Sequence, residues 1–89
     1  MIELVWDVPF MCILKKWQKK HPELIKVLEN KLILFTENPF HPALKTHRLS
    51  GNLKDYWALY VTYEHRLIFK FISESKVLLI DLGTHDEVY

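Results

Sequence analysis

The sequence predicts an α+β domain, in which two short helices pack as a hairpin on one face of a mostly antiparallel sheet. Two observations support this class. Apolar residues recur at helical spacing up to about residue 37, and from residue 46 onwards β-branched and aromatic residues are separated by short turns. A chain of 89 residues can bury one modest hydrophobic core, so we expect a single domain spanning residues 1–89.

The N-terminal part predicts one strand and two helices. Residues 2–6 form a short first strand. Asp7 is the expected N-cap of a helix that has Pro9 in its first turn and runs to about Lys20. The His-Pro-Glu sequence at 21–23 breaks this helix and starts a second one, which ends before Asn38. The apolar stripes of the two helices are Phe10, Ile13, Leu14 and Trp17, and Leu24, Val27, Leu28, Leu32 and Phe35.

The rest of the chain predicts four strands, after a loop at 39–42. The strands cover residues 46–49, 56–61, 66–72 and 76–82. The sequence Ser-Gly-Asn at 50–52 closes the first of them, and Ser-Glu-Ser at 73–75 makes the last turn. The predicted order of elements is therefore β-α-α-β-β-β-β.

The alternation of side chains along these strands assigns residues to two faces. Tyr60, Arg66 and His85 fall on the face away from the helices, where they can share one surface. His65 then points away from Arg66, and we interpret it as structural. Tyr56, Ala58, Ile68, Lys70 and Asp81 also fall on the outer face. The core face takes Trp57, Leu59, Val61, Leu67, Phe69, Phe71, Leu78, Ile80 and Leu82.

The net charge of +1 conceals a local bias. Between residues 45 and 70 there are five bases and two acids, whereas the last nineteen residues hold one base and four acids. An anionic ligand is expected at the positive segment. A second basic group lies in the first helix, where we expect it to meet acidic groups of a partner. It consists of Lys15, Lys16, Lys19 and Lys20.

Composition and motifs exclude several classes of protein. No apolar run is long enough to span a membrane, and the N-terminus lacks the basic start of a signal peptide. Cys12 is the single cysteine, which is typical of a cytoplasmic protein. The five histidines and Cys12 show none of the paired spacings of a zinc site, so we expect neither a metal nor another cofactor.

Three residues near strand ends indicate a chemistry. Glu64 and Arg66 stand where one strand gives way to the next, and His85 follows the last strand. A carboxylate, a guanidinium and an imidazole on rigid strands are suited to metal-free RNA cleavage. One group takes the 2′-hydroxyl proton, one stabilises charge on the phosphate, and one protonates the leaving oxygen.

Two stretches of the chain resemble a known family. The sequences HRLSGNLKDYWALYVTYEHRLIFKF and VLLIDLGTHDEVY are similar to the RelE/YoeB/YafQ superfamily of bacterial toxins. The EHRL segment resembles the YoeB branch, and HRLSGNLKDY and GTH resemble the YafQ branch. The resemblance implies the RelE-like fold and a ribosome-dependent mRNA endonuclease of a type II toxin–antitoxin system, neutralised by a cognate antitoxin.

The resemblance also implies roles for individual residues. His85 matches the C-terminal histidine that acts as general acid, and Arg66 matches the arginine that binds the scissile phosphate. Glu64 matches an acid that acts as base or orients the arginine. His47 matches the histidine before the Leu-Ser-Gly segment in YafQ-like toxins and is an alternative base.

Other positions concern substrate binding. Lys45 is expected to contact phosphate, and Tyr89 resembles a C-terminal aromatic residue that stacks on a base. Tyr60 belongs to the same surface, and it stands where YafQ-like toxins have a second catalytic histidine. Ala43 falls near the position of a glutamate proposed as base in YoeB-like toxins.

Two other functions remain open. A ParE-like toxin shares the fold but inhibits DNA gyrase and lacks the catalytic set, so Glu64, Arg66 and His85 disfavour it. A toxin homologue that acts only by protein binding is the other alternative, and the near-neutral charge and Tyr60 are compatible with it.

Overall fold

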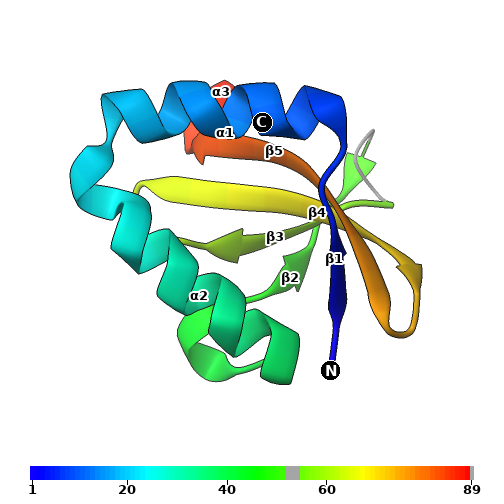
Figure 1. The fold of residues 1–89 in the computed structure, drawn as a ribbon. Coiled ribbons are helices and arrows are strands. Elements are labelled where there is room, and N and C mark those ends of the chain that lie inside the picture. The colour runs from blue at the N-terminus through cyan, green and yellow to red at the C-terminus, as the bar shows by residue number, and fades with distance from the viewer. Residues whose placement is uncertain (52–54, 89) are drawn as a thin grey trace.

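The computed structural model describes residues 1–51 and 55–88, and its arrangement confirms the predicted α+β class (Figure 1). In chain order the elements are β1 (Glu3–Val5), α1 (Val8–Lys20), a 3-10 turn (Pro22–Leu24), α2 (Ile25–Glu37), a 3-10 turn (Pro42–Leu44), β2 (His47–Arg48), β3 (Trp57–Tyr60), β4 (His65–Ser73), β5 (Lys76–Thr84) and α3 (His85–Val88). Helix α3 and the second 3-10 turn were not predicted. No helix in the described ranges is long and apolar enough to cross a bilayer.

The strands form one five-stranded sheet in the order β1-β5-β4-β3-β2. Strand β1 runs parallel to β5, and the other neighbours are antiparallel. In β4, Arg66 pairs with Tyr60 of β3 on one side and with Gly83 of β5 on the other. The end of β3, the start of β4 and the end of β5 therefore meet at one end of the sheet, where α3 begins.

The start of α1 follows the sequence prediction. The Asp7 side chain accepts a hydrogen bond of 3.0 Å from the backbone N–H of Phe10, and Pro9 lies in the first turn. This is an N-cap, which satisfies a donor that has no partner within the helix. Pro22 then ends the helix at the expected break, and α2 turns away from α1 at a sharp corner (Figure 1).

The core lies between the two long helices and one face of the sheet. The helices bury Phe10, Leu14 and Trp17 from α1 and Leu28 and Phe35 from α2. The sheet buries Leu59, Leu67, Phe69, Val77, Leu79 and Leu82 against them, and Val61, directly after β3, joins the same cluster. Trp57 and Phe71 pack at the edge of this cluster.

The prediction for the core face of β5 is wrong at two positions. Leu78 and Ile80 are only half-buried, whereas Val77 and Leu79 are fully buried. The cause is a bulge, because Ile68 pairs with Asp81 while Phe69 pairs with Leu79. One extra residue shifts the alternation by one position. Before the bulge the odd-numbered residues Val77 and Leu79 face the core, and after it the even-numbered Leu82 does.

The outer face of the sheet is less open than alternation alone predicts. Ala58 and Ile68 are cross-strand partners that are fully buried, and neither belongs to the main core cluster. Arg66, expected to be outward and open, is only 8% exposed. The sheet thus has a small buried patch on this side as well, and Arg66 lies near its end.

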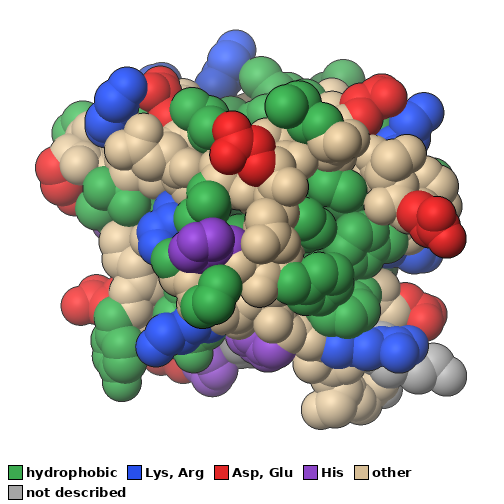
Figure 2. All heavy atoms as spheres, turned by 90° about the horizontal axis from the view of Figure 1, so that it is seen from below, with side chains coloured by type: hydrophobic (Ala, Val, Ile, Leu, Met, Phe, Trp, Pro, Cys, Tyr) green, Lys and Arg blue, Asp and Glu red, His purple; other side chains and the backbone are tan. Residues whose placement is uncertain are grey.

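Hydrophobic side chains also gather on the face of the molecule seen in Figure 2. Among the exposed large hydrophobic residues is Phe40, which packs against Trp57 and Phe71 with centroid distances of 5.6 and 6.2 Å. Trp57 and Phe71 contact the core in turn. An aromatic cluster therefore continues the core to the surface near the end of α2.

His65 has the structural role that alternation indicated. It is 5% exposed and accepts a hydrogen bond of 3.1 Å from the Trp17 indole N–H. Its ring also lies 4.5 Å from the ring of His21, measured between centroids. Burial lowers the pKa of His65, and the nearby His21 lowers it further, against the opposite effect of Glu64, Glu87 and Glu23.

This burial predicts a loss of stability in mild acid. The pKa of His65 is lower in the folded chain than its ordinary value of 6.5, so the unfolded chain binds more protons below that pH. The free energy of unfolding should therefore be highest above pH 6.5 and fall as the pH drops below it. Urea unfolding at pH 7.5 and 5.5 measures this difference. The difference in unfolding free energy between the two pH values should shrink in His65→Gln and persist in His41→Gln. An equal difference in both variants would show that His65 is not its source.

Candidate functional site

The turn between β3 and β4 carries Glu64, and Arg66 follows it in β4. The turn is closed by the carbonyl of His65, which accepts hydrogen bonds from the N–H groups of Val61 (2.9 Å) and Thr62 (3.3 Å). The Thr62 hydroxyl accepts a further bond of 3.2 Å from the backbone N–H of His65. Tyr63 and Glu64 therefore lie at the tip of a well-defined turn, beside the first residues of β4.

Arg66 is held from two sides. Its guanidinium donates through Nη1 to the carbonyl of Tyr63 and, at 3.4 Å, to the carbonyl of Thr62. Its central carbon lies 3.6 Å from the centroid of the Tyr60 ring, a cation–π contact. These contacts fix a permanent positive charge at the end of the sheet, with the remaining donors of the fork left to meet an anion.

One pocket brings together three residues proposed from the sequence. It has a volume of about 460 Å³ and is lined by Tyr63, Glu64, Arg66, Thr84, His85 and Asp86. Glu64 comes from the turn, Arg66 from β4 and His85 from the first residue of α3. A carboxylate, a guanidinium and an imidazole thus face the same space, from three adjoining elements.

The position of His85 depends on α3. The Glu87 carboxylate accepts a hydrogen bond of 2.9 Å from the backbone N–H of Thr84, which is the return contact of a capping box. This bond lowers the pKa of Glu87. Gly83 leaves room for the turn, because a Cβ there would lie 3.1–3.3 Å from atoms of Glu87 and Val88. The Thr-x-x-Glu spacing could have predicted α3 from the sequence.

His47 and Lys45 belong to a neighbouring group around Tyr60. The rings of His47 and Tyr60 are 6.0 Å apart, and the Lys45 Nζ lies 5.6 Å from the Tyr60 centroid. The imidazole of His47 also contacts the carbonyl of Lys45 at 2.9 Å. Tyr60 therefore connects these two residues with Arg66, although neither His47 nor Lys45 lines the pocket that holds His85.

Tyr89 lies outside the described residues. Across residues 1–51 and 55–88, no three potential metal-ligating side chains come together. Sequence reasoning overlooked Tyr63, whose side chain lies beside Glu64 in the pocket. Its signal was an aromatic residue in a turn, where nothing in the core requires one.

Comparison with known proteins agrees with this fold. Toxin YoeB of Escherichia coli K12 is 28% identical over 78 residues, which cover 86% of this chain and 92% of that protein. The crystal structure of YafQ from E. coli BL21(DE3) matches with a TM-score of 0.82 at 22% identity, over 100% of this chain and 99% of the other. YafQ in the E. coli DinJ-YafQ complex matches with a TM-score of 0.73 at 23% identity, with the same coverage.

The family comparison covers nearly the whole chain. Residues 3–89 match the model of the YafQ family, which is described as the bacterial toxin of a type II toxin–antitoxin system. The superfamily that the EHRL and GTH segments resemble is thus confirmed. The chain belongs to the YafQ family of bacterial type II toxins.

Proposed function

We propose that this chain is an endoribonuclease that cleaves mRNA on the ribosome, in the cytoplasm. The observation that carries the proposal is the pocket shared by Glu64, Arg66 and His85. Its residues supply a base, a fixed cation and an acid, which are the groups that transesterification of RNA requires. No step of this chemistry needs a metal ion.

The proposed reaction assigns one task to each residue. Arg66 binds non-bridging oxygens of the scissile phosphate and stabilises the charge that develops on them. Glu64 takes the proton of the 2′-hydroxyl while the 2′-oxygen of the ribose forms a bond to phosphorus. The bond from phosphorus to the 5′-oxygen breaks, and His85 gives its proton to that oxygen. The products are a 2′,3′-cyclic phosphate and a 5′-hydroxyl.

The surroundings of Glu64 and His47 bear on which of the two we propose as the base. Glu64 lines the pocket with Arg66 and His85, whereas His47 packs against the Tyr60 ring and does not line that pocket. A base must reach the proton it removes, within about 3 Å or through one water. This favours Glu64, with His47 and Lys45 contacting the substrate beyond Tyr60.

A cleavage assay with and without ribosomes tests the proposal. Purified protein should cut an mRNA bound to programmed ribosomes, and leave the same naked mRNA largely intact. Equal cleavage of both forms would contradict the dependence on ribosomes. If neither form is cut, the chain is not this nuclease, and gyrase inhibition or protein binding becomes the better explanation.

The proposed partner is a cognate antitoxin. E. coli YafQ is found in complex with DinJ, and Staphylococcus aureus YoeB with YefM. We propose that an antitoxin neutralises this chain in the same manner, as expected for a member of a type II system.

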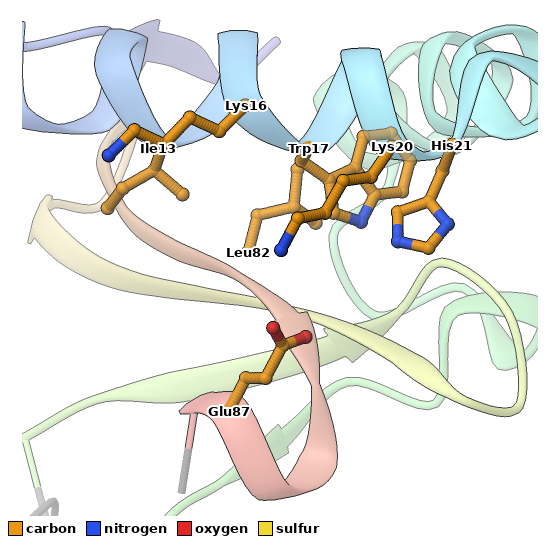
Figure 3. Close-up of a pocket in the computed structure, with 7 residues that line it drawn as sticks. All are labelled: Ile13, Lys16, Trp17, Lys20, His21, Leu82 and Glu87. Carbon is orange, nitrogen blue, oxygen red and sulfur yellow. The ribbon is translucent and has the colours of Figure 1, made fainter.

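The lysines of α1 form an exposed ridge on the helix, opposite its buried face. Lys16 and Lys20 line a pocket together with Ile13, Trp17 and Leu82, and Glu87 of α3 points towards Lys20 across it (Figure 3). Lys15 and Lys19 are also exposed. Such a ridge is suited to phosphates or to an acidic partner segment.

Reversing the charge of these lysines should show whether they contact the ribosome or the antitoxin. Replacing Lys15, Lys16, Lys19 and Lys20 by Glu is expected to weaken ribosome binding by about tenfold or more at low salt, because each lost phosphate contact removes a counterion-release contribution. Filter binding over a range of salt concentrations measures the effect. The pair Lys15→Glu and Lys19→Glu should weaken binding more than the matched pair Lys26→Glu and Lys76→Glu. Unchanged affinity for both ribosome and antitoxin in the fourfold variant would show that the ridge contacts neither.

A further inference from the structure

A second hollow adjoins the pocket of Arg66 and His85. Its volume is about 200 Å³, and its lining includes Lys31 of α2, Lys45, Tyr60 and Tyr63. Tyr63 lines both the hollow and the pocket, so it stands between them. None of the residues that line the hollow is acidic: they are Lys31, Ala43, Lys45, Tyr60, Val61, Thr62 and Tyr63.

The Tyr63 ring is presented to solvent by the hydrogen-bonded turn between β3 and β4. Tyr63 is 85% exposed, and within the described part of the chain its ring packs against no other aromatic ring. Its carbonyl, however, accepts a hydrogen bond from the Arg66 guanidinium. Tyr63 therefore combines an exposed ring with a backbone hydrogen bond to Arg66, the cation expected to bind the scissile phosphate.

Two lysines, Lys31 and Lys45, also line the hollow. Lys31 donates a hydrogen bond of 3.0 Å to the carbonyl of Ala43, which anchors the side chain over the 3-10 turn. The Lys45 ammonium lies 5.6 Å from the Tyr60 ring centroid, and Lys45 has a left-handed backbone with φ of 50°. Each ammonium has three donors, so both can still contact an anion.

We propose that this hollow is a nucleotide subsite, which binds the nucleotide adjacent to the scissile phosphate. Its base stacks on Tyr63, and its phosphate is bound by Lys31 and Lys45. Cations beside an open aromatic face are the elements of single-strand RNA binding. The proposal rests on the proposed nuclease function, and it adds Tyr63 and Lys31 to the residues that bind the substrate.

The test combines a protein change with a substrate change. Tyr63→Ala removes the ring but keeps the carbonyl that accepts from Arg66, so the cleavage pocket should survive. The substrate is ribosome-bound mRNA in which the nucleotides flanking the cleavage site are replaced, one at a time, by an abasic residue. At one flanking position, the abasic change should lower kcat/KM of the wild-type protein by roughly five- to 150-fold, the range for stacking one base.

The deciding quantity is whether the effect of the abasic nucleotide on kcat/KM depends on the presence of the Tyr63 ring. Tyr63→Ala should lower kcat/KM on intact mRNA by a similar factor and should be nearly insensitive to the abasic change at that position. Tyr63→Phe should behave as the wild type, and so should Phe40→Ala, a matched change at another exposed aromatic residue. Lys31→Gln should reduce the salt dependence of substrate binding by about one phosphate contact.

The possible outcomes separate the two proposals. If the wild-type protein cleaves but the effects of Tyr63→Ala and the abasic residue simply multiply at every position, the subsite is overturned and the nuclease stands. If the wild-type protein does not cleave intact mRNA on ribosomes, the proposed function fails and the subsite fails with it.

Discussion

Replacing Arg66 by Ala is expected to lower the rate of single-turnover mRNA cleavage by about two to four orders of magnitude. This is the range for removing a group that stabilises charge in the transition state. Arg66 is the fixed cation of the pocket, stacked on Tyr60 and bonded to the turn that carries Glu64. Quenched-flow cleavage of ribosome-bound mRNA measures the effect, with Lys70→Ala as a control at an exposed cation of the same strand.

A second variant separates chemistry from folding. Arg66 is 8% exposed and its guanidinium bonds to two carbonyls, so its removal should also lower the free energy of unfolding. Arg66→Lys keeps a positive charge and most of the packing but loses the planar fork. It should fold like the wild type and still lose about a hundredfold in rate. Near wild-type cleavage by Arg66→Lys would mean that a point charge suffices and that the fork has no role.

The His85→Ala variant should lose about two to four orders of magnitude in the same assay, as expected for a general acid. Its side chain is 62% exposed, so the thermal unfolding midpoint should hardly change. His41→Ala serves as the control. A His85→Ala variant that cleaves at the wild-type rate would remove His85 from the mechanism.

Local signals account for the part of the fold that could be predicted. Asp7 and Pro9 define the start of α1, Pro22 defines its end, and the period of two identifies β3 and β4. The bulge at Ile80 could not be predicted, because it depends on how β5 pairs with β4 across the sheet. The error at Leu78 and Ile80 is the direct result of that single extra residue.

The candidate site, like the fold, could be predicted from the sequence only in part. Alternation correctly put Arg66 on the face opposite His65, and the pocket joins Arg66 with Glu64 and His85. The burial of Arg66 was missed, because it comes from the Tyr60 ring and the carbonyls of the turn. Helix α3 was missed although Thr84 and Glu87 carry its capping signal, since four residues offer no hydrophobic period.

If the pocket of Glu64, Arg66 and His85 cleaves RNA by attack of the 2′-hydroxyl, cleavage requires that hydroxyl on the nucleotide before the scissile phosphate. The most direct test is cleavage of two ribosome-bound mRNAs that differ only in a single 2′-deoxy substitution at the nucleotide before the scissile phosphate. The all-ribose mRNA should be cut to a fragment ending in a 2′,3′-cyclic phosphate or 3′-phosphate, and the substituted mRNA should not be cut at that site. Cleavage of both mRNAs at that site and at similar rates would contradict this mechanism.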